Sequence, residues 1–177
     1  MGFWDPGGFT ADGDVAAFRR RRSVELKHGR IAMLATMGFI TPEITGKFPG
    51  YLSPSQGLKF ADIPNGLAAI SKVPALGWAQ IFAYGGFVEF SAGLDADQKK
   101  GTPGDYGWKV LTSADPAVRT KKLNSELANS RLAMTAIMGM FFQNGVSGTT
   151  GPEMWFGRAA FENELGVQAS GVCHFVG

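Results

Sequence analysis

Three segments of the 177-residue chain are expected to form helices long and apolar enough to cross a membrane. The first is expected over residues 15–41, and Pro42 should end it because proline lacks the backbone N–H that a continuing helix needs. The second, 74–93, opens with a proline and contains a single charged residue, Glu89. These two segments therefore predict long helices with few charges on their walls.

The third helix is expected over residues 116–144, because Asp115 followed by proline is typical of a helix start and Gly145 supplies the stop. Residues 42–73 and 94–115 are rich in Gly, Pro, Ser and Asp, so they are interpreted as ordered loops that contain at most a short helical turn. A short amphipathic helix is expected at 155–165. The pattern predicts one all-α domain over residues 1–177.

Composition narrows the functional classes. Seventeen basic and 15 acidic residues give a net charge of +2, which lacks the basic footprint of a nucleic-acid-binding protein. A single cysteine, Cys173, excludes an internal disulfide framework. The 25 glycines and 14 phenylalanines are typical of helices that pack closely in lipid or around large flat ligands.

Lysine and arginine lie unevenly on the two sides that three membrane crossings would define. Excluding Lys27, Arg30 and Arg131, ten lie at the start of the first helix and around the second loop, and four lie on the other side. The ten are Arg19, Arg20, Arg21, Arg22, Lys99, Lys100, Lys109, Arg119, Lys121 and Lys122, and the four are Lys47, Lys59, Lys72 and Arg158. This asymmetry places the N-terminus on the side where the protein was made.

A repeat connects the first and third helices. ELKHGRIAMLATMGFI at 25–40 and ELANSRLAMTAIMGMF at 126–141 share eight identical residues at an offset of 101. Two copies of one helix suggest a pseudo-two-fold axis, and the small residues of both copies would let the backbones approach closely. A single Glu-x-x-His-x-Arg pattern is usually a solvated helix face, but its repetition within an apolar frame favours a functional site.

Helix geometry predicts the partners of the charged residues in this repeat. Arg30 follows Glu25 by five residues, which places it about 140° round the helix, so the two cannot easily meet. Across a two-fold axis the partners are reciprocal: Arg30 with Glu126, and Arg131 with Glu25. Each glutamate is then charge-compensated but keeps an oxygen lone pair for a ligand.

His28 and Asn129 add a neutral donor beside each glutamate. The magnesium of a chlorophyll has four ring nitrogens and needs one or two axial donors, so single carboxylate, imidazole or amide groups suit it. A free Mg²⁺ would need a cluster of oxygen ligands, so no free metal site is expected. A di-iron carboxylate site requires two Glu-x-x-His motifs and two further glutamates, and the second copy here is Glu-x-x-Asn.

Both motifs resemble those of the three-helix light-harvesting chlorophyll-binding superfamily of thylakoid membranes, and the resemblance covers essentially the whole chain. GFWDPGGF, AQIFAYGGFVEF and MGMFFQNGVSG are similar to the red-lineage branch. The stretches YLSPSQGLKFADIPNGLAAISKVPALGWAQ and GTPGDYGWKVLTSADP resemble the membrane-intrinsic peridinin chlorophyll a/c proteins of dinoflagellates, which are sisters of the diatom fucoxanthin proteins.

The resemblance implies a set of chlorophyll ligands. Ligand positions are occupied in both motifs, in the middle helix, near the end of the third helix and in the tail. In that order, the residues are Glu25, His28, Glu126 and Asn129; Gln80 and Glu89; Gln143; and His174. Arg30 and Arg131 occupy the positions of the cross-pairing arginines. The sequence departs from the two-fold pattern at Pro42, the equivalent of Gln143, because proline has no side-chain donor.

The resemblance implies an antenna protein, not an enzyme, and the sequence shows no nucleophile with a base and no phosphate-binding loop. The implied cofactors are chlorophyll a, chlorophyll c and carotenoids, with peridinin and diadinoxanthin expected, together with bound thylakoid lipids. The implied partners are membrane lipid, neighbouring antenna proteins and photosystem core subunits, with photosystem I preferred from the subfamily. The implied location is the chloroplast thylakoid membrane, crossed several times. An energy-dissipating photoprotective or stress member of the superfamily is the alternative.

The basic asymmetry generates a topology prediction, in which the N-terminus and residues 94–115 face the stroma and residues 42–73 face the lumen. Protease added to intact thylakoids should cut at Lys99–Lys100, because that pair then lies on the exposed side. Fragment masses from the digested membranes check this. Protection of Lys99–Lys100 together with cleavage at Lys59 would reverse the topology.

Overall fold

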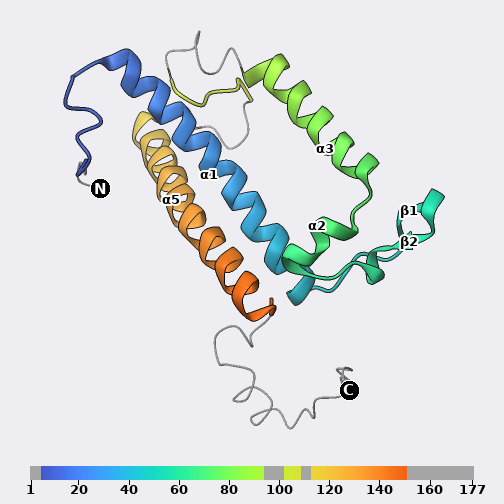
Figure 1. The fold of residues 1–177 in the computed structure, drawn as a ribbon. Helices are drawn as coiled ribbons and strands as arrows, with labels where there is room; N and C mark the ends of the chain where they lie inside the picture. Colours follow the sequence, from blue (N-terminus) through green and yellow to red (C-terminus); the bar gives the residue numbers. More distant parts are fainter. Residues whose placement is uncertain (1–4, 94–101, 109–112, 151–177) are drawn as a thin grey trace. The chain divides into compact units, whose positions relative to one another are not determined.

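The computed structural model describes residues 5–93, 102–108 and 113–150 (Figure 1). The chain forms two compact units, each made of two stretches that are distant in the sequence. The first unit comprises Met1–Ala35 and Ala75–Thr135, and the second comprises Thr36–Pro74 and Ala136–Gly177. The expected tail helix at 155–165 and His174 lie outside the described residues.

The two repeat-bearing helices are α1 (Val15–Ile44) and α5 (Pro116–Ser147). Both begin after an aspartate that caps the helix. The backbone N–H two residues further on donates to Oδ1 of Asp14 at 2.8 Å and to Oδ1 of Asp115 at 3.0 Å. Because these aspartates are also 101 residues apart, the internal repeat extends from the charged motif back to the helix caps.

Pro42 does not end α1, so that prediction is wrong: the helix continues to Ile44. Two threonine hydroxyls donate to backbone carbonyls around the proline, Thr41 Oγ1 to the carbonyl of Met37 at 2.6 Å and Thr45 Oγ1 to that of Thr41 at 3.0 Å. The Thr45 N–H also donates to the carbonyl of Thr41 at 3.0 Å. The threonine side chains thus bond to the helix backbone before and after the proline, which itself removes a single N–H donor.

The middle segment, expected at 74–93, forms the α-helix α3 (Ala75–Val88), which continues into the π-helical turn η4 (Glu89–Gly93). Most side chains of α3 are exposed. The α-helical hydrogen-bond pattern changes at Glu89, where the π-helical turn begins. The sequence showed no sign of this change.

Residues 42–73 contain more regular structure than the predicted loop. Tyr51–Ser53 (β1) and Leu58–Lys59 (β2) pair as an antiparallel hairpin, with Tyr51 opposite Lys59 and Ser53 opposite Leu58. The remaining elements are the 3-10 turns Pro54–Gln56, Phe60–Asp62 and Gly66–Ala68 and the short helix α2 (Ala69–Lys72). The hairpin strands are too short to produce a period-two pattern, which explains why the sequence did not predict them.

Asn144 fixes this loop within the second unit. Its buried side chain accepts the Leu67 N–H at 2.9 Å and donates to the Thr149 carbonyl at 3.0 Å. Gly66 has a φ of +71° and lies against the same amide, so a side chain at that position would collide with Asn144. Glu43, the equivalent of Asn144 in the first repeat copy, accepts a hydrogen bond from Asn65 at 2.7 Å. Both equivalent positions therefore hold the same loop.

The N-terminal motif is organised by Asp5. Its carboxylate accepts the Thr10 hydroxyl at 2.6 Å, the Thr10 N–H at 2.9 Å and the Phe9 N–H at 3.1 Å. The hydrogen bond from the Thr10 side chain, followed by that from its backbone, lowers the pKa of Asp5 below its ordinary value. The Asp-Pro-Gly-Gly stretch is thus a defined turn before α1.

Most buried positions of α1 hold small residues, whereas many large apolar side chains of the helices are exposed. The buried positions of α1 are Ser23, Leu26, Gly29 and Ala32, which follow one another at three-residue spacing. By contrast Leu34 and Phe82 are each 75% exposed. Within the described residues, no helix combines the length and the apolar character required to cross a membrane.

The closest approach of α1 and α5 in the first unit is at Gly29. A Cβ atom at this position would collide with the Cβ and Oγ atoms of Ser130, which is fully buried. Within the part of the chain that the structure describes, Ser130 Oγ has no hydrogen-bond partner, and the contact with Gly29 leaves room only for small residues. The small-residue positions of the repeat therefore determine how closely the two helices meet.

We predict that Gly29→Ala destabilises the protein by about 1 to 3 kcal/mol, the usual cost of overpacking a tight contact. Gly38→Ala is the matched control, because a Cβ at Gly38 meets nothing within 4 Å. That control should be neutral or stabilising by up to about 1 kcal/mol, since alanine has the higher helix propensity. Thermal unfolding followed by circular dichroism measures both variants. Equal melting temperatures would contradict the close approach.

Candidate functional site

Two reciprocal ion pairs join α1 and α5 in the first unit, where Figure 1 shows the N-terminal halves of these helices side by side. Arg30 Nε donates to Glu126 Oε1 at 2.8 Å, and Arg131 Nε donates to Glu25 Oε1 at 2.6 Å. This is the reciprocal arrangement that the repeat predicts. Each helix therefore supplies one carboxylate and the cation that compensates the carboxylate of the other helix.

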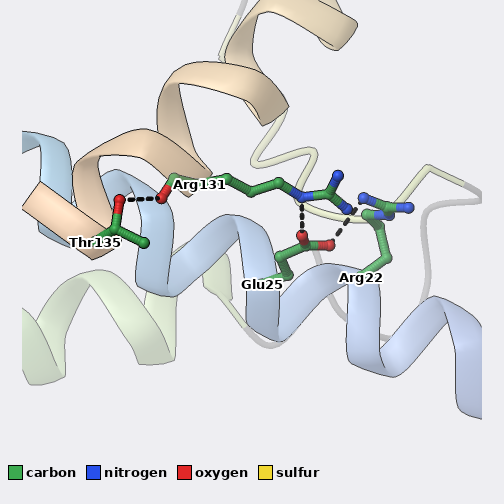
Figure 2. Close-up of polar contacts among 4 residues, drawn as sticks. All are labelled: Arg22, Glu25, Arg131 and Thr135. Carbon is green, nitrogen blue, oxygen red and sulfur yellow. Dashed lines mark hydrogen bonds and ion pairs between the residues drawn. The ribbon is translucent and has the colours of Figure 1, made fainter. Parts of the chain in front are cut away.

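Glu25 has a second cation on its other oxygen. Arg22 Nη1 donates to Glu25 Oε2 at 2.8 Å, so the carboxylate lies between two guanidinium groups (Figure 2). Arg22 lies one helical turn before Glu25, the spacing at which side chains of one helix meet. Arg131 is itself near Thr135, whose hydroxyl lies 3.4 Å from the Arg131 carbonyl. Glu25 is thus over-compensated relative to the single arginine that we expected.

Glu126 has a different environment. Its Oε1 accepts from Arg30, whereas its Oε2 has no recorded protein partner among the described residues. Arg30 is held on the opposite side by a 2.8 Å hydrogen bond from Nη1 to the Gly104 carbonyl, and its guanidinium lies 5.5 Å from the ring centroid of Tyr106. The Glu126 carboxylate therefore has one oxygen bound to a fixed cation and one oxygen available to a ligand.

His28 and Asn129 are oriented in the same way in the two copies of the repeat. His28 Nδ1 lies 2.9 Å from the carbonyl of Val24, and Asn129 Nδ2 donates to the carbonyl of Ser125 at 2.9 Å. Both carbonyls lie four residues earlier in the same helix. With the donor nitrogen used by the backbone, His28 Nε2 and Asn129 Oδ1 are the atoms left to act as acceptors or metal ligands. Both side chains are exposed.

A third ion pair between different helices connects α1 to Glu89, the residue that follows α3. Lys27 Nζ lies 2.8 Å from Glu89 Oε2, across 62 positions of sequence. Gln80 is exposed on α3, nine residues before Glu89. Gln143 belongs to the second unit, where it is partly buried and its backbone carbonyl accepts a hydrogen bond from Ser147 Oγ at 2.7 Å.

Sequence reasoning missed three of these partners. Arg22 was counted as one of a basic run, although its three-residue spacing from Glu25 could have indicated the contact. Lys27 was not assigned a role, because nothing in the sequence indicates that α3 returns to α1 at Glu89. The Gly104 carbonyl beneath Arg30 could not be predicted from a residue type at all.

The donors of this region are dispersed rather than clustered. Among the described residues, no three His, Cys, Asp or Glu side chains come together as a metal site would require. Instead each candidate donor stands singly: Glu89 and Glu126 each have a cation on one oxygen, and Glu25 has a cation on each of its two oxygens. Such an arrangement suits a metal whose other coordination positions are already filled by its own organic ligand.

Comparison with known proteins agrees with this chemistry. The family model described as Chlorophyll A-B binding protein matches residues 1–145. A fucoxanthin-chlorophyll a-c binding protein F, chloroplastic, from Macrocystis pyrifera is 43% identical over 156 residues, which cover 83% of this chain and 71% of that protein. A fucoxanthin-chlorophyll a-c binding protein B, chloroplastic, from Phaeodactylum tricornutum is 41% identical over 147 residues, 79% of this chain and 72% of that protein.

A caroteno-chlorophyll a-c-binding protein from Amphidinium carterae is 58% identical over 85 residues, which cover 48% of this chain and 83% of that protein. Against two further Macrocystis pyrifera relatives, the chain spans 66% of their length. The red-lineage and dinoflagellate resemblance of the motifs is thereby confirmed.

Proposed function

Because the chain belongs to the Chlorophyll A-B binding protein family, we propose that it is a light-harvesting antenna protein of the chloroplast thylakoid membrane. It binds chlorophyll a, chlorophyll c and carotenoid, and it passes the absorbed energy to a photosystem. The names of the similar proteins from Macrocystis pyrifera and Amphidinium carterae support this set of pigments. Nothing in the proposed function requires a bond to be made or broken.

The observation that carries the proposal is the pair of reciprocal Arg–Glu contacts. A carboxylate in an apolar setting is costly unless a cation compensates it. Arg30 and Arg131 supply this compensation while each occupies one oxygen of its glutamate. Glu126 retains a second oxygen that would hold a chlorophyll magnesium.

The remaining proposed ligands fit the same requirement for one neutral or compensated donor. His28 and Asn129 present Nε2 and Oδ1 after their other polar atom has bonded to the backbone. Gln80 and Gln143 offer neutral amide oxygens on α3 and α5. Bound chlorophyll would supply light absorption and the excited state, and these residues would fix its position and orientation.

The outward-facing apolar side chains also support the proposal. Leu34 of α1 and Phe82 and Phe87 of α3 are largely exposed, and the buried positions are occupied mainly by small residues. A soluble monomer rarely exposes apolar side chains over so many helical faces. Pigment rings and lipid chains would cover them, and they would exclude water from the compensated carboxylates.

We further propose that α1, α3 and α5 cross the membrane with the N-terminus on the stromal side. The uneven distribution of lysine and arginine supports this orientation. The name of the Amphidinium carterae protein supports a bound carotenoid. The motif resemblance to the peridinin chlorophyll a/c proteins supports peridinin and diadinoxanthin as that carotenoid, and it supports photosystem I, together with neighbouring antenna proteins, as the energy acceptor. Thylakoid lipids would complete the surface.

The antenna function is tested by energy transfer in the purified pigment protein. Excitation of carotenoid and of chlorophyll c should both produce chlorophyll a fluorescence, because the protein holds the pigments at short, fixed separations. The excitation spectrum should therefore follow the absorption spectrum. A strongly shortened fluorescence lifetime at full pigment content would instead favour the photoprotective alternative, and a purified protein without chlorophyll would contradict both.

The unequal compensation of the two glutamates gives a second prediction. Arg30→Leu leaves Glu126 without its recorded cation, whereas Arg131→Leu leaves Glu25 with Arg22. Arg30→Leu should therefore lose one chlorophyll and about 1.5 to 3 kcal/mol of stability, the usual worth of a hydrogen bond to a charged group. Arg131→Leu should lose less of both. Pigment stoichiometry and melting temperature after reconstitution measure the difference.

Two further variants control this comparison. Arg119→Leu removes an exposed arginine near the start of α5 that has no side-chain partner among the described residues, and it should change neither quantity. Adding Glu126→Gln to Arg30→Leu removes the uncompensated charge but keeps an amide donor, so it should recover pigment. A double variant no better than Arg30→Leu alone would show that the two residues do not act as a pair.

A further inference from the structure

The two copies of the repeat differ at one charged position that the two-fold arrangement does not explain. Lys27, in the sequence Glu-Leu-Lys-His, corresponds to Ala128 in Glu-Leu-Ala-Asn. The cross-pairing of α1 and α5 uses one glutamate and one arginine from each copy. Lys27 is therefore an additional cation on α1 that serves neither of these two pairs.

The position of Lys27 on the helix excludes Glu25 as its partner. Two residues correspond to about 200° of helical rotation, so the two side chains leave opposite sides of α1. Lys27 instead reaches α3, where its Nζ lies 2.8 Å from Glu89 Oε2. The side chain of Lys27 is 27% exposed, which is low for a lysine, so it is held rather than solvated.

Glu89 then shares the arrangement of Glu126. One carboxylate oxygen faces a cation from another helix, and Oε1 has no recorded protein partner among the described residues. Glu89 also begins the π-helical turn Glu89–Gly93. Such turns are frequent at functional sites.

We propose that Lys27 is a positioning residue for a third carboxylate ligand, Glu89: it compensates the charge of Glu89 and directs Oε1 to the magnesium of a chlorophyll held at the end of α3. This inference rests on the proposed antenna function. It explains why the first repeat copy carries a lysine where the second carries alanine. The middle helix α3 has no counterpart in the repeat, so only one copy needs the extra cation.

A purely structural tether between α1 and α3 predicts different behaviour, and this difference makes the proposal testable. A tether needs both charges, so its loss cannot be repaired by neutralising Glu89. Charge compensation of a ligand is different, because glutamine at position 89 keeps an oxygen donor and requires no cation. The double variant Lys27→Met with Glu89→Gln therefore separates the two roles.

The experiment uses the full chain, refolded with chlorophyll a, chlorophyll c and carotenoid, and counts chlorophylls per polypeptide after extraction. Lys27→Met should lose one chlorophyll, with a matching change in the visible circular dichroism spectrum. Lys27→Arg should retain it, because the positive charge remains. Adding Glu89→Gln to Lys27→Met should restore the lost chlorophyll, whereas adding Glu25→Gln should not.

Lys121→Met is the matched control, since it removes an exposed lysine near the start of α5 and changes the net charge equally. It should leave the pigment count and the helix content unchanged. If Lys27→Met does not refold, recovery of the folded, pigmented protein by the added Glu89→Gln supports the proposal in the same way. Full pigment in Lys27→Met, or a loss that Glu89→Gln does not repair, would overturn it.

Failure of this inference is distinguishable from failure of the proposed function. A wild-type chain that refolds with its chlorophylls while Lys27→Met keeps the same number leaves the antenna function intact and removes the role of Lys27. A wild-type chain that binds no chlorophyll removes the function itself.

Discussion

Compensation of a carboxylate by an arginine from the neighbouring helix is the interaction on which the first unit depends. A carboxylate among apolar groups without a compensating cation would destabilise the helix pair. The contacts of Arg30 with Glu126 and of Arg131 with Glu25 solve this problem twice with one motif. They also join α1 to α5, so the carboxylate that would bind a pigment also takes part in an ion pair that holds the two helices together.

The close approach of the two helices makes these contacts possible. Gly29 lies against Ser130, where no larger side chain fits, and this brings each arginine within reach of the opposite glutamate. The small residues thus set the distance between α1 and α5, and the charged pairs set how the two helices align along their length. The large apolar residues are left on the outside, where Phe82 and Leu34 would meet pigment or lipid rather than a protein core.

The sequence predicted those features that follow from repetition and helical geometry. Eight identities at an offset of 101 and the angle between Glu25 and Arg30 were sufficient to indicate the cross-pairing. The aspartate caps continue the same offset beyond the aligned motif. The local rule failed at Pro42, because proline removes a single N–H donor and the backbone bonding resumes after it, with the Thr45 N–H donating to the Thr41 carbonyl.

Contacts between segments of unrelated sequence could not be predicted in this way. The Gly104 carbonyl that holds Arg30 carries no side-chain signal, and the contact of Lys27 with Glu89 depends on where α3 ends. The hairpin of β1 and β2 is also set by its turn and its neighbours, since five strand residues are too few for a pattern. The candidate ligands were therefore recognisable from sequence, but the environment of each ligand was not.

The central claim is that Glu126, compensated by Arg30 on one oxygen, holds chlorophyll magnesium through the oxygen that the arginine leaves available. A cryo-electron microscopy map of the protein purified with its native pigments tests it most directly. The account predicts chlorophyll density whose magnesium is ligated by the Glu126 carboxylate while Arg30 contacts the other oxygen. A map in which the Glu126 carboxylate contacts protein groups alone, with the chlorophylls ligated elsewhere, would contradict it.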